Sequence, residues 1–139
     1  KKIFSAHKAG LKVILCLGET EDDKNSGNTT VKVSEQLTAA LTSTITLENF
    51  IIAYEPVWAI GSGKTPFTND ITTVLAALKA KIKEALNLKA DKSIPILYGG
   101  SVSSNNAKDI LGLAEVDGAL VGGASLSYQD FSKIIEAAQ

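Results

Sequence analysis

The sequence predicts a single α/β domain segment, residues 1–139, in which parallel strands alternate with helices. Four short apolar runs have no polar alternation, which is typical of strands buried on both faces of a parallel sheet. Amphipathic segments with a helical period separate these runs. Strict alternation of strands and helices favours crossover connections, with the helices outside the sheet. Two architectures stay open on this evidence, a doubly wound open sheet and part of a barrel.

The predicted strands are residues 13–17, 50–54, 94–98 and 119–121. Small or acidic residues follow each of them: Gly18 and Glu19, then Glu55, then Gly99 and Gly100, then Gly122 and Gly123. In both candidate architectures, ligands bind at the carboxyl ends of the strands. We therefore expect the functional residues to be among those that follow the strands.

The helices are predicted from apolar residues at three- and four-residue spacing, over residues 33–45, 71–86, 107–111 and 128–138. Thr68, Asn69 and Asp70 are possible caps of the second helix, and Ser127 has the spacing to Asp130 of a capping box. Apolar residues have the same spacing directly from residue 1, with no capping residue before them. This start predicts that the sequence begins inside a helix of a longer protein.

The composition argues against several classes of partner. The 14 basic and 15 acidic residues give a net charge of −1, and the lysines are scattered, so we expect no nucleic acid and no membrane partner. No apolar run approaches the roughly 18 residues of a membrane span. Cys16 is the one cysteine and lies in an apolar run, which predicts a small buried hydrophobe rather than a nucleophile. These features fit a cytoplasmic protein with a small-molecule ligand.

The stretch YEPVWAIGSGKT, residues 54–65, ends like a phosphate-binding P-loop. The P-loop motif needs a glycine five residues before its Gly-Lys pair, and that position is Trp58 here. The motif also needs a helix that opens at the Lys-Thr pair, whereas Pro66 and Phe67 intervene before the next predicted helix. The stretch is therefore not interpreted as a P-loop.

Glu55 instead has the setting of a catalytic base under a lid. It ends a strand, and a proline, two bulky apolar residues and a glycine-rich segment follow it. Apolar lid residues exclude water, and glycines allow hinge motion and leave their N–H groups unobstructed. From spacing alone, the alternative stays open that Glu55 is a surface residue at the end of a strand and that Trp58 belongs to the core.

Glycine pairs follow the last two strands, in Gly99-Gly100-Ser101 and in Gly122-Gly123-Ala124-Ser125. Each pair offers unhindered backbone N–H groups that open toward a predicted helix N-terminus, which is a favourable arrangement for a phosphate. The alternative is that both pairs form tight strand-to-helix turns without a ligand.

Three motifs carry a resemblance to a known family: AYEPVWAIGSGKT, ILYGGSV and DGALVGGASL, in this order. They resemble the triosephosphate isomerases, which are glycolytic aldose-ketose isomerases, and similar motifs extend from Cys16 to the C-terminal helix, over essentially the whole chain. The resemblance implies the parallel (β/α)8 TIM barrel, of roughly 250 residues. This chain would supply the last four strand-helix units, and the open sheet is set aside on that family ground.

The resemblance also implies a role for each matching residue. Glu55 would be the catalytic base, which moves a proton between two carbons of dihydroxyacetone phosphate through an enediolate to give glyceraldehyde 3-phosphate. The N–H of Gly61, together with Ser101, Gly122 and Gly123, would bind the substrate phosphate. No metal and no cofactor is implied. The lid would consist of Pro56, Val57, Trp58, Ala59, Ile60, Gly61, Ser62, Gly63, Lys64 and Thr65, with the last two as hinge residues.

The chain departs from the family pattern in the groups that stabilise the enediolate. The family's electrophilic histidine, and a lysine and an asparagine near its N-terminus, have no counterpart here, since His7 lies in the helix before the first strand. Removing one such donor typically costs about 10² to 10³ in rate. We therefore expect this chain alone to be nearly inactive until the N-terminal half of the barrel completes it.

The partners implied by the resemblance are a small phosphorylated triose, the N-terminal half of the barrel and, when the barrel is complete, a second copy in a homodimer. Two alternatives stay open. One is a noncatalytic half-barrel that binds phosphate, in which Glu55 has no catalytic role. The other is half of a different phosphate-handling barrel.

Overall fold

A four-stranded parallel sheet is the centre of the structure, a computed structural model that describes residues 1–41, 47–90 and 92–139. Its strands lie in the order of the chain, so each pairs with the next one in sequence. The register places Cys16 beside Ala53 and Tyr54 beside Tyr98. The parallel sheet predicted from the apolar runs is confirmed. The strands are β1 (Val13–Leu17), β2 (Phe50–Tyr54), β3 (Ile96–Tyr98) and β4 (Gly118–Ala119).

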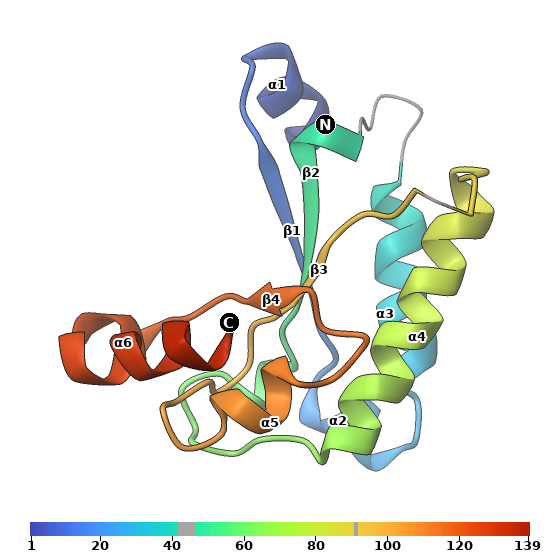
Figure 1. The fold of residues 1–139 in the computed structure, drawn as a ribbon. Helices are drawn as coiled ribbons and strands as arrows, with labels where there is room; N and C mark the ends of the chain where they lie inside the picture. Colours follow the sequence, from blue (N-terminus) through green and yellow to red (C-terminus); the bar gives the residue numbers. More distant parts are fainter. Residues whose placement is uncertain (42–46, 91) are drawn as a thin grey trace.

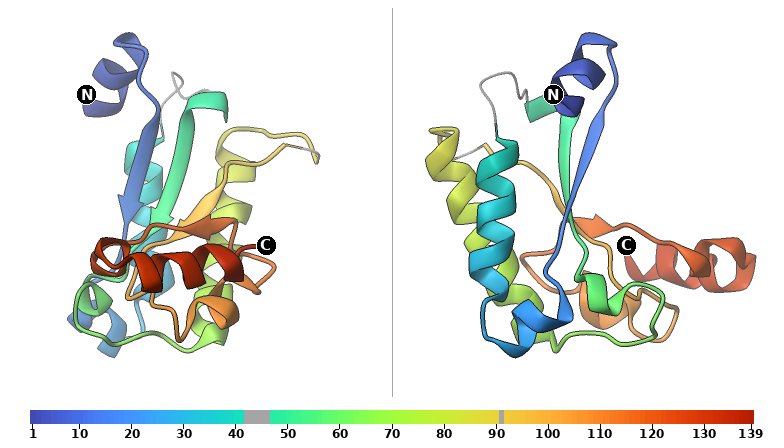
Figure 2. Two further views of the ribbon diagram at one scale, coloured as in Figure 1. Left: turned by 60° about the vertical axis from the view of Figure 1, so that its left-hand side comes forward. Right: turned by 180° about the vertical axis from the view of Figure 1, so that it is seen from behind.

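Helices connect the strands and cover the sheet unevenly. Helices α3 and α4 lie side by side along one face of the sheet, while α6 lies on the other side of β4 (Figure 1). Figure 2 shows α1 at the amino end of β1, far from the loops that follow the strands. The helices are α1 (Lys2–Lys8), α2 (Glu21–Asn25), α3 (Thr29–Ala40), α4 (Thr68–Ala85), α5 (Ala107–Leu111) and α6 (Tyr128–Ala137), with 3-10 turns η1 (Leu47–Asn49), η2 (Val57–Ala59) and η3 (Gly123–Leu126).

The core lies between the sheet and the helix pair α3 and α4. Apolar residues at helical spacing on α3 and α4 meet the side chains of β2 and β3, and burial of this apolar surface is the main favourable term in folding. Helix α4 provides the longest apolar stripe. Its buried members are Ile71, Val74, Leu75, Leu78 and Ile82, and they pack with Val33, Leu37, Phe50, Ile52, Tyr54, Ile96 and Tyr98.

Two of the predicted strands differ in extent from the observed ones. The third was expected over residues 94–98, but the strand begins at Ile96 because Pro95 has no N–H to donate to a neighbouring strand. Its carbonyl still accepts a hydrogen bond from the Ile52 N–H, at 3.0 Å. The fourth strand was expected over residues 119–121 and instead spans Gly118–Ala119, next to β3.

The expected burial on both faces holds for β2 but not for β1. In β2 four of the five residues are buried, whereas in β1 the side chains of Ile14 and Cys16 are exposed. Strand β1 is an edge of this sheet, and Ala53, which lies beside Cys16 on the next strand, is fully buried. The prediction that Cys16 is buried was therefore wrong.

The polar segment after β1 contains a helix that the sequence analysis missed. Helix α2 begins after Thr20, whose side chain accepts a hydrogen bond from the Asp23 N–H, while the Asp23 carboxylate accepts one from the Thr20 N–H. This is a complete capping box. The apolar periodicity that predicts helices is absent from so short and acidic a segment, and the spacing of Thr20 and Asp23 was the available signal.

The helix ends were predicted less well than the helices. Phe67 precedes α4, and none of the three proposed caps acts as one. Ser127 does cap α6 through the Asp130 N–H, and the Asp130 carboxylate accepts hydrogen bonds from the side chains of Ser104 and Ser127. The helix predicted over 33–45 begins at Thr29 and ends at Ala40, and residues 42–46 lie outside the described residues. Among the helices described, none is both long and apolar enough to cross a membrane.

Candidate active site

The loops after β2, β3 and β4 surround one cavity of about 640 Å³. The parallel strands bring these loops to the same edge of the sheet, as expected for α/β folds. The cavity is lined by Glu55 and by every residue that was predicted to bind phosphate. Its lining includes Glu55, Ile60, Gly61, Gly63, Gly99, Gly100, Ser101, Gly122 and Gly123.

Glu55 is positioned by the last hydrogen bond of the β1–β2 ladder and by two glycines. Its N–H donates to the carbonyl of Leu17 at 2.7 Å. A Cβ atom on Gly18 would lie 1.7 Å from the Glu55 carbonyl oxygen, and one on Gly99 would lie 2.5 Å from the Glu55 Cγ. Both positions therefore require glycine if Glu55 is to keep this place.

Cys16 lies on the same side of the sheet as Glu55 and forms a side-chain hydrogen bond with it. Desolvation of the thiol, followed by that hydrogen bond and by the negative charge of Glu55, raises the pKa of Cys16 to about 11. At neutral pH the thiol stays protonated, so Cys16 is a poor nucleophile. The sequence analysis also set nucleophilic chemistry aside, although it placed the residue in the core.

The two glycine-rich loops differ in whether the expected helix N-terminus follows them. After Gly100 and Ser101 the chain runs through residues 102–106 before α5 begins, and Gly122 leads into the single 3-10 turn η3. A Cβ on Gly122 or Gly123 would meet no atom within 4 Å, so the backbone there is open to the cavity. The expected helix N-terminus is thus absent directly after Ser101, whereas Gly122 and Gly123 form the N-terminus of the short helix η3.

The segment 56–65, called the lid below, is attached at its beginning to a buried carboxylate. Glu19 is 1% exposed and accepts hydrogen bonds from the Trp58 Nε1 at 2.6 Å and from the Tyr54 hydroxyl at 3.2 Å. Its carbonyl accepts another from the Val57 N–H at 3.0 Å. Burial, and then the charge of Glu19, raise the pKa of Tyr54 well above its usual range. Trp58 is therefore fixed by a polar contact and is not an ordinary core residue.

On its other side the lid contacts the loop after β3. The Ser101 hydroxyl donates to the Ala59 carbonyl at 2.5 Å, and Asn106 Nδ2 donates both to the Ser101 carbonyl at 2.8 Å and to the Thr65 hydroxyl at 3.2 Å. Between these attachments Gly61 and Gly63 have φ values of 63° and 74°. Backbone in this left-handed region favours glycine, so the two glycines are required by the shape of the lid.

Sequence reasoning missed several residues that shape this site. Glu19 was noted only as a strand-end residue, Gly99 was interpreted as a phosphate donor although its role here is to make room for Glu55, and Asn106 was not considered. The Tyr98 hydroxyl is also buried beside Gly100, and the described residues offer it no hydrogen-bond partner. The position of Glu19 in the sequence could have indicated its role, since Glu19 follows the first strand as Glu55 follows the second.

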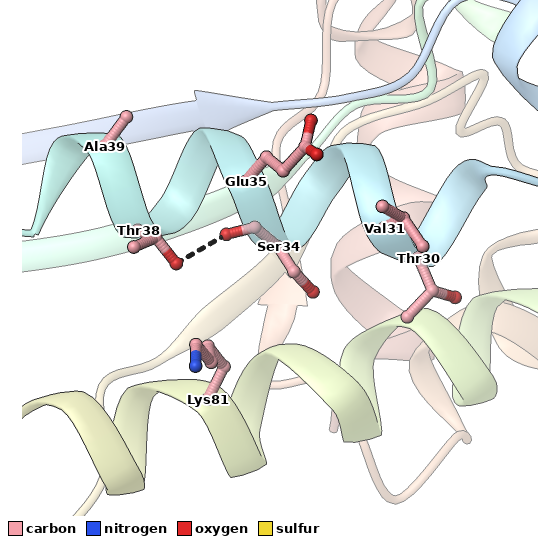
Figure 3. Close-up of a pocket in the computed structure, with 7 residues that line it drawn as sticks. All are labelled: Thr30, Val31, Ser34, Glu35, Thr38, Ala39 and Lys81. Carbon is pink, nitrogen blue, oxygen red and sulfur yellow. Dashed lines mark hydrogen bonds between the residues drawn. The ribbon is translucent and has the colours of Figure 1, made fainter.

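A second hollow of about 670 Å³ lies on the outer surface between α3 and α4 (Figure 3). Its wall carries small hydroxyl residues, and the Thr38 hydroxyl there donates to the carbonyl of Ser34 at 2.9 Å. It is remote from the strand ends and holds no group that the sequence analysis singled out. In the part of the chain that the structure describes, no three His, Cys, Asp or Glu side chains gather in a way that could hold a metal ion.

Comparison with known proteins shows which family this chain belongs to. The sequence model of the family "Triosephosphate isomerase" matches residues 1–138. The triosephosphate isomerase of Ruegeria sp. is 47% identical over 136 residues, which cover 98% of this chain and 55% of the relative. That of Rhizobium meliloti is 45% identical, with 98% of this chain and 53% of the relative covered.

The fold matches as well as the sequence. The crystal structure of triosephosphate isomerase from Bartonella henselae superimposes with a TM-score of 0.86 at 38% identity, covering 98% of this chain and 54% of that protein. The chain thus spans about half the length of the relatives it matches, and its four strand-helix units correspond to the C-terminal half of a (β/α)8 barrel. The chain belongs to the triosephosphate isomerase family.

Proposed function

We propose that this chain is the half of a triosephosphate isomerase that carries the catalytic base and the phosphate site. The complete enzyme would interconvert dihydroxyacetone phosphate and glyceraldehyde 3-phosphate. One observation carries the proposal: Glu55 and the four proposed phosphate ligands Gly61, Ser101, Gly122 and Gly123 line the same cavity. A base and an anion site in one cavity are what proton transfer on a phosphorylated substrate requires.

Glu55 is proposed to take a proton from the carbon next to the substrate carbonyl and to return it to the neighbouring carbon. Its side chain is partly buried and has the room left by Gly99. A single hydrogen bond from Cys16 occupies one of the several lone pairs of the carboxylate and leaves others for the substrate. Shuttling of one proton by a single carboxylate needs no metal or cofactor.

The phosphate is proposed to bind where the three loops meet. Main-chain N–H groups of Gly61, Gly122 and Gly123 and the residue Ser101 border the same space, and glycines let an anion approach the backbone closely. The lid, residues 56–65, would then cover the substrate and keep water from the enediolate. Val57 and Ile60 are about half exposed and supply its apolar surface.

The other half of the barrel is proposed to supply what this chain lacks. In the family, a histidine, a lysine and an asparagine stabilise the developing charge, and no matching residues are found here. That half would pair with the edge strands β1 and β4 and would close the barrel. We further propose that the complete enzyme is a homodimer in the cytoplasm, as the resemblance implies.

The test is the variant Glu55→Gln in the full-length polypeptide from which this segment comes. Loss of the base should lower kcat by at least about 10²-fold, the low end of what a general base contributes. The affinity for glycerol 3-phosphate, which carries the phosphate but cannot isomerise, should stay within about twofold. Steady-state kinetics and isothermal titration calorimetry give the two values.

Two results would decide against this function. A noncatalytic phosphate-binding protein would bind glycerol 3-phosphate but show no isomerase activity even with Glu55 intact. Turnover of a different phosphosugar in preference to triose phosphates would indicate another phosphate-handling barrel.

A further inference from the structure

Helix α2 contacts both ends of the lid from outside the cavity. Near the start of the lid, the Lys24 Nζ lies 3.9 Å from the centroid of the Trp58 ring. At its end, the Lys64 Nζ lies 3.5 Å from the Glu21 Oε1. Helix α2 is only five residues long, so one short element contacts two lid residues that are six positions apart in the chain.

Helix α2 is also held in place by contacts that do not involve the lid. The Gln36 side chain of α3 accepts a hydrogen bond from the Gly18 N–H and donates one to the Gly18 carbonyl, both at 2.9 Å. The capping box of Thr20 and Asp23 then fixes the first turn of α2. The segment that bears Glu21 and Lys24 is therefore tied to β1 and α3, in addition to the contacts of Glu19 with Val57 and Trp58.

The contacts with α2 favour one arrangement of the lid. Between Trp58 and Lys64 lie Gly61 and Gly63, which line the cavity together with the loops after β3 and β4. We propose that Glu21 and Lys24 are positioning residues that clamp the lid in this arrangement and so raise the affinity for phosphorylated ligands. The proposal rests on the proposed function, since it assigns a regulation of the same site.

The ion pair between Glu21 and Lys64 is weak, which allows the lid to open. The side chains of Lys64 and Glu21 are 64% and 60% exposed, and ion pairs this exposed change an equilibrium by about 1.5- to 5-fold. A lid must open in each catalytic cycle, and a much stronger contact would slow product release. Because water surrounds the pair, its effect should decrease as salt is added.

A charge swap in the full-length polypeptide tests the clamp. We expect Glu21→Lys and Lys64→Glu each to weaken glycerol 3-phosphate binding by about 1.5- to 5-fold and to raise KM by a similar factor, with a smaller change in kcat. The double variant Glu21→Lys/Lys64→Glu restores the pair with reversed charges and should regain wild-type affinity. In 1 M salt the single variants should approach the wild type.

A matched control is present on α3, where Lys32 and Glu35 form another exposed ion pair at 3.4 Å that does not touch the lid. Glu35→Lys makes the same charge change as Glu21→Lys and should leave KM and glycerol 3-phosphate binding unchanged. Equal effects of these two variants, or a double variant no better than the single ones, would overturn the clamp. A wild-type protein that neither isomerises triose phosphates nor binds glycerol 3-phosphate would overturn the clamp and the proposed function together.

Discussion

At the residue scale, the position of the Glu55 side chain depends on the presence of glycine at a neighbouring position. Gly99 has no side chain, and an added Cβ would lie 2.5 Å from the Glu55 Cγ and 2.9 Å from its Oε1. We expect Gly99→Ala to displace the carboxylate and to lower kcat by about 10²-fold, because a misplacement of about 1 Å can cost that much. Steady-state kinetics of the full-length variant measure this.

The control for Gly99→Ala is Gly118→Ala in β4. The added methyl group there would meet only the Cδ2 of Leu97, at 3.0 Å, which a flexible side chain can relieve. This variant should keep kcat within a few-fold of the wild type. If Gly99→Ala were fully active, the steric account of Glu55 would be wrong.

The raised pKa of the Cys16 thiol predicts how the rate of its alkylation depends on pH. Because its pKa is raised from 9.0 to about 11, the thiolate fraction near pH 8 should be about a hundredfold below that of an ordinary cysteine. Alkylation by iodoacetamide should be slow at pH 8 and should rise in rate up to about pH 11. In the unfolded chain the thiol ionises first, so the stabilisation from the protonated thiol is complete below about pH 9 and is lost as the pH rises through about 11. Mass spectrometry of the modified protein would follow the rate, and rapid alkylation at pH 8 would contradict the assignment.

At the element scale, α2 depends on its capping box. Thr20→Ala removes the acceptor of the Asp23 N–H and should lower the free energy of unfolding by about 0.5–2 kcal/mol. The hydrogen bonds from Thr20 also lower the pKa of Asp23. The stabilisation from these bonds to the carboxylate is therefore present above the ordinary pKa of 3.8, and it is lost as the pH falls through the lower pKa of Asp23 in the folded protein. Urea unfolding of both proteins between pH 7 and pH 3 should show the difference shrinking at the acidic end.

Thr38→Ala is the matched control for the cap. The Thr38 hydroxyl donates to the carbonyl of Ser34 within α3 and caps nothing, and alanine is a better helix former than threonine. This variant should leave the free energy of unfolding unchanged or slightly raised. A loss as large as that of Thr20→Ala would mean that the cap has no special role.

At the scale of the whole molecule, the sheet formed by the described residues has two unpaired edges. Among these residues, strand β1 pairs only with β2 and strand β4 only with β3, and several apolar side chains are exposed. Unpaired edges of this kind invite association with other chains. The 139-residue chain by itself should therefore self-associate at micromolar concentration, and its isomerase activity should be close to zero. The exposed apolar residues include Ile14, Leu11, Phe131 and Ile135.

Sedimentation velocity measures this association. Addition of the N-terminal half of the barrel as a separate polypeptide should replace the heterogeneous species by a defined complex and should restore activity. A stable, monodisperse monomer of the 139-residue chain would contradict the account of the two edges.

The sequence by itself determined the order of the elements, the parallel sheet and the identity of the candidate site. Runs such as residues 13–17 and 50–54 are apolar without alternation, and that pattern is local, so it can be read without coordinates. The motifs around Glu55, Gly61 and Ser101 are likewise contiguous in sequence. Contacts between residues that are far apart in the sequence leave no such local pattern.

Only the tertiary structure decided which residues support the site and which faces stay open. Glu19 meets Trp58 across 39 positions, and Lys64 meets Glu21 across 43, because parallel strands bring distant loops to one edge of the sheet. The requirement for glycine at position 99 arises from the space that Glu55 occupies, and the exposure of Cys16 arises from its place on an edge strand. Such facts depend on the distance between residues in space, which the folded chain sets and local sequence patterns do not contain.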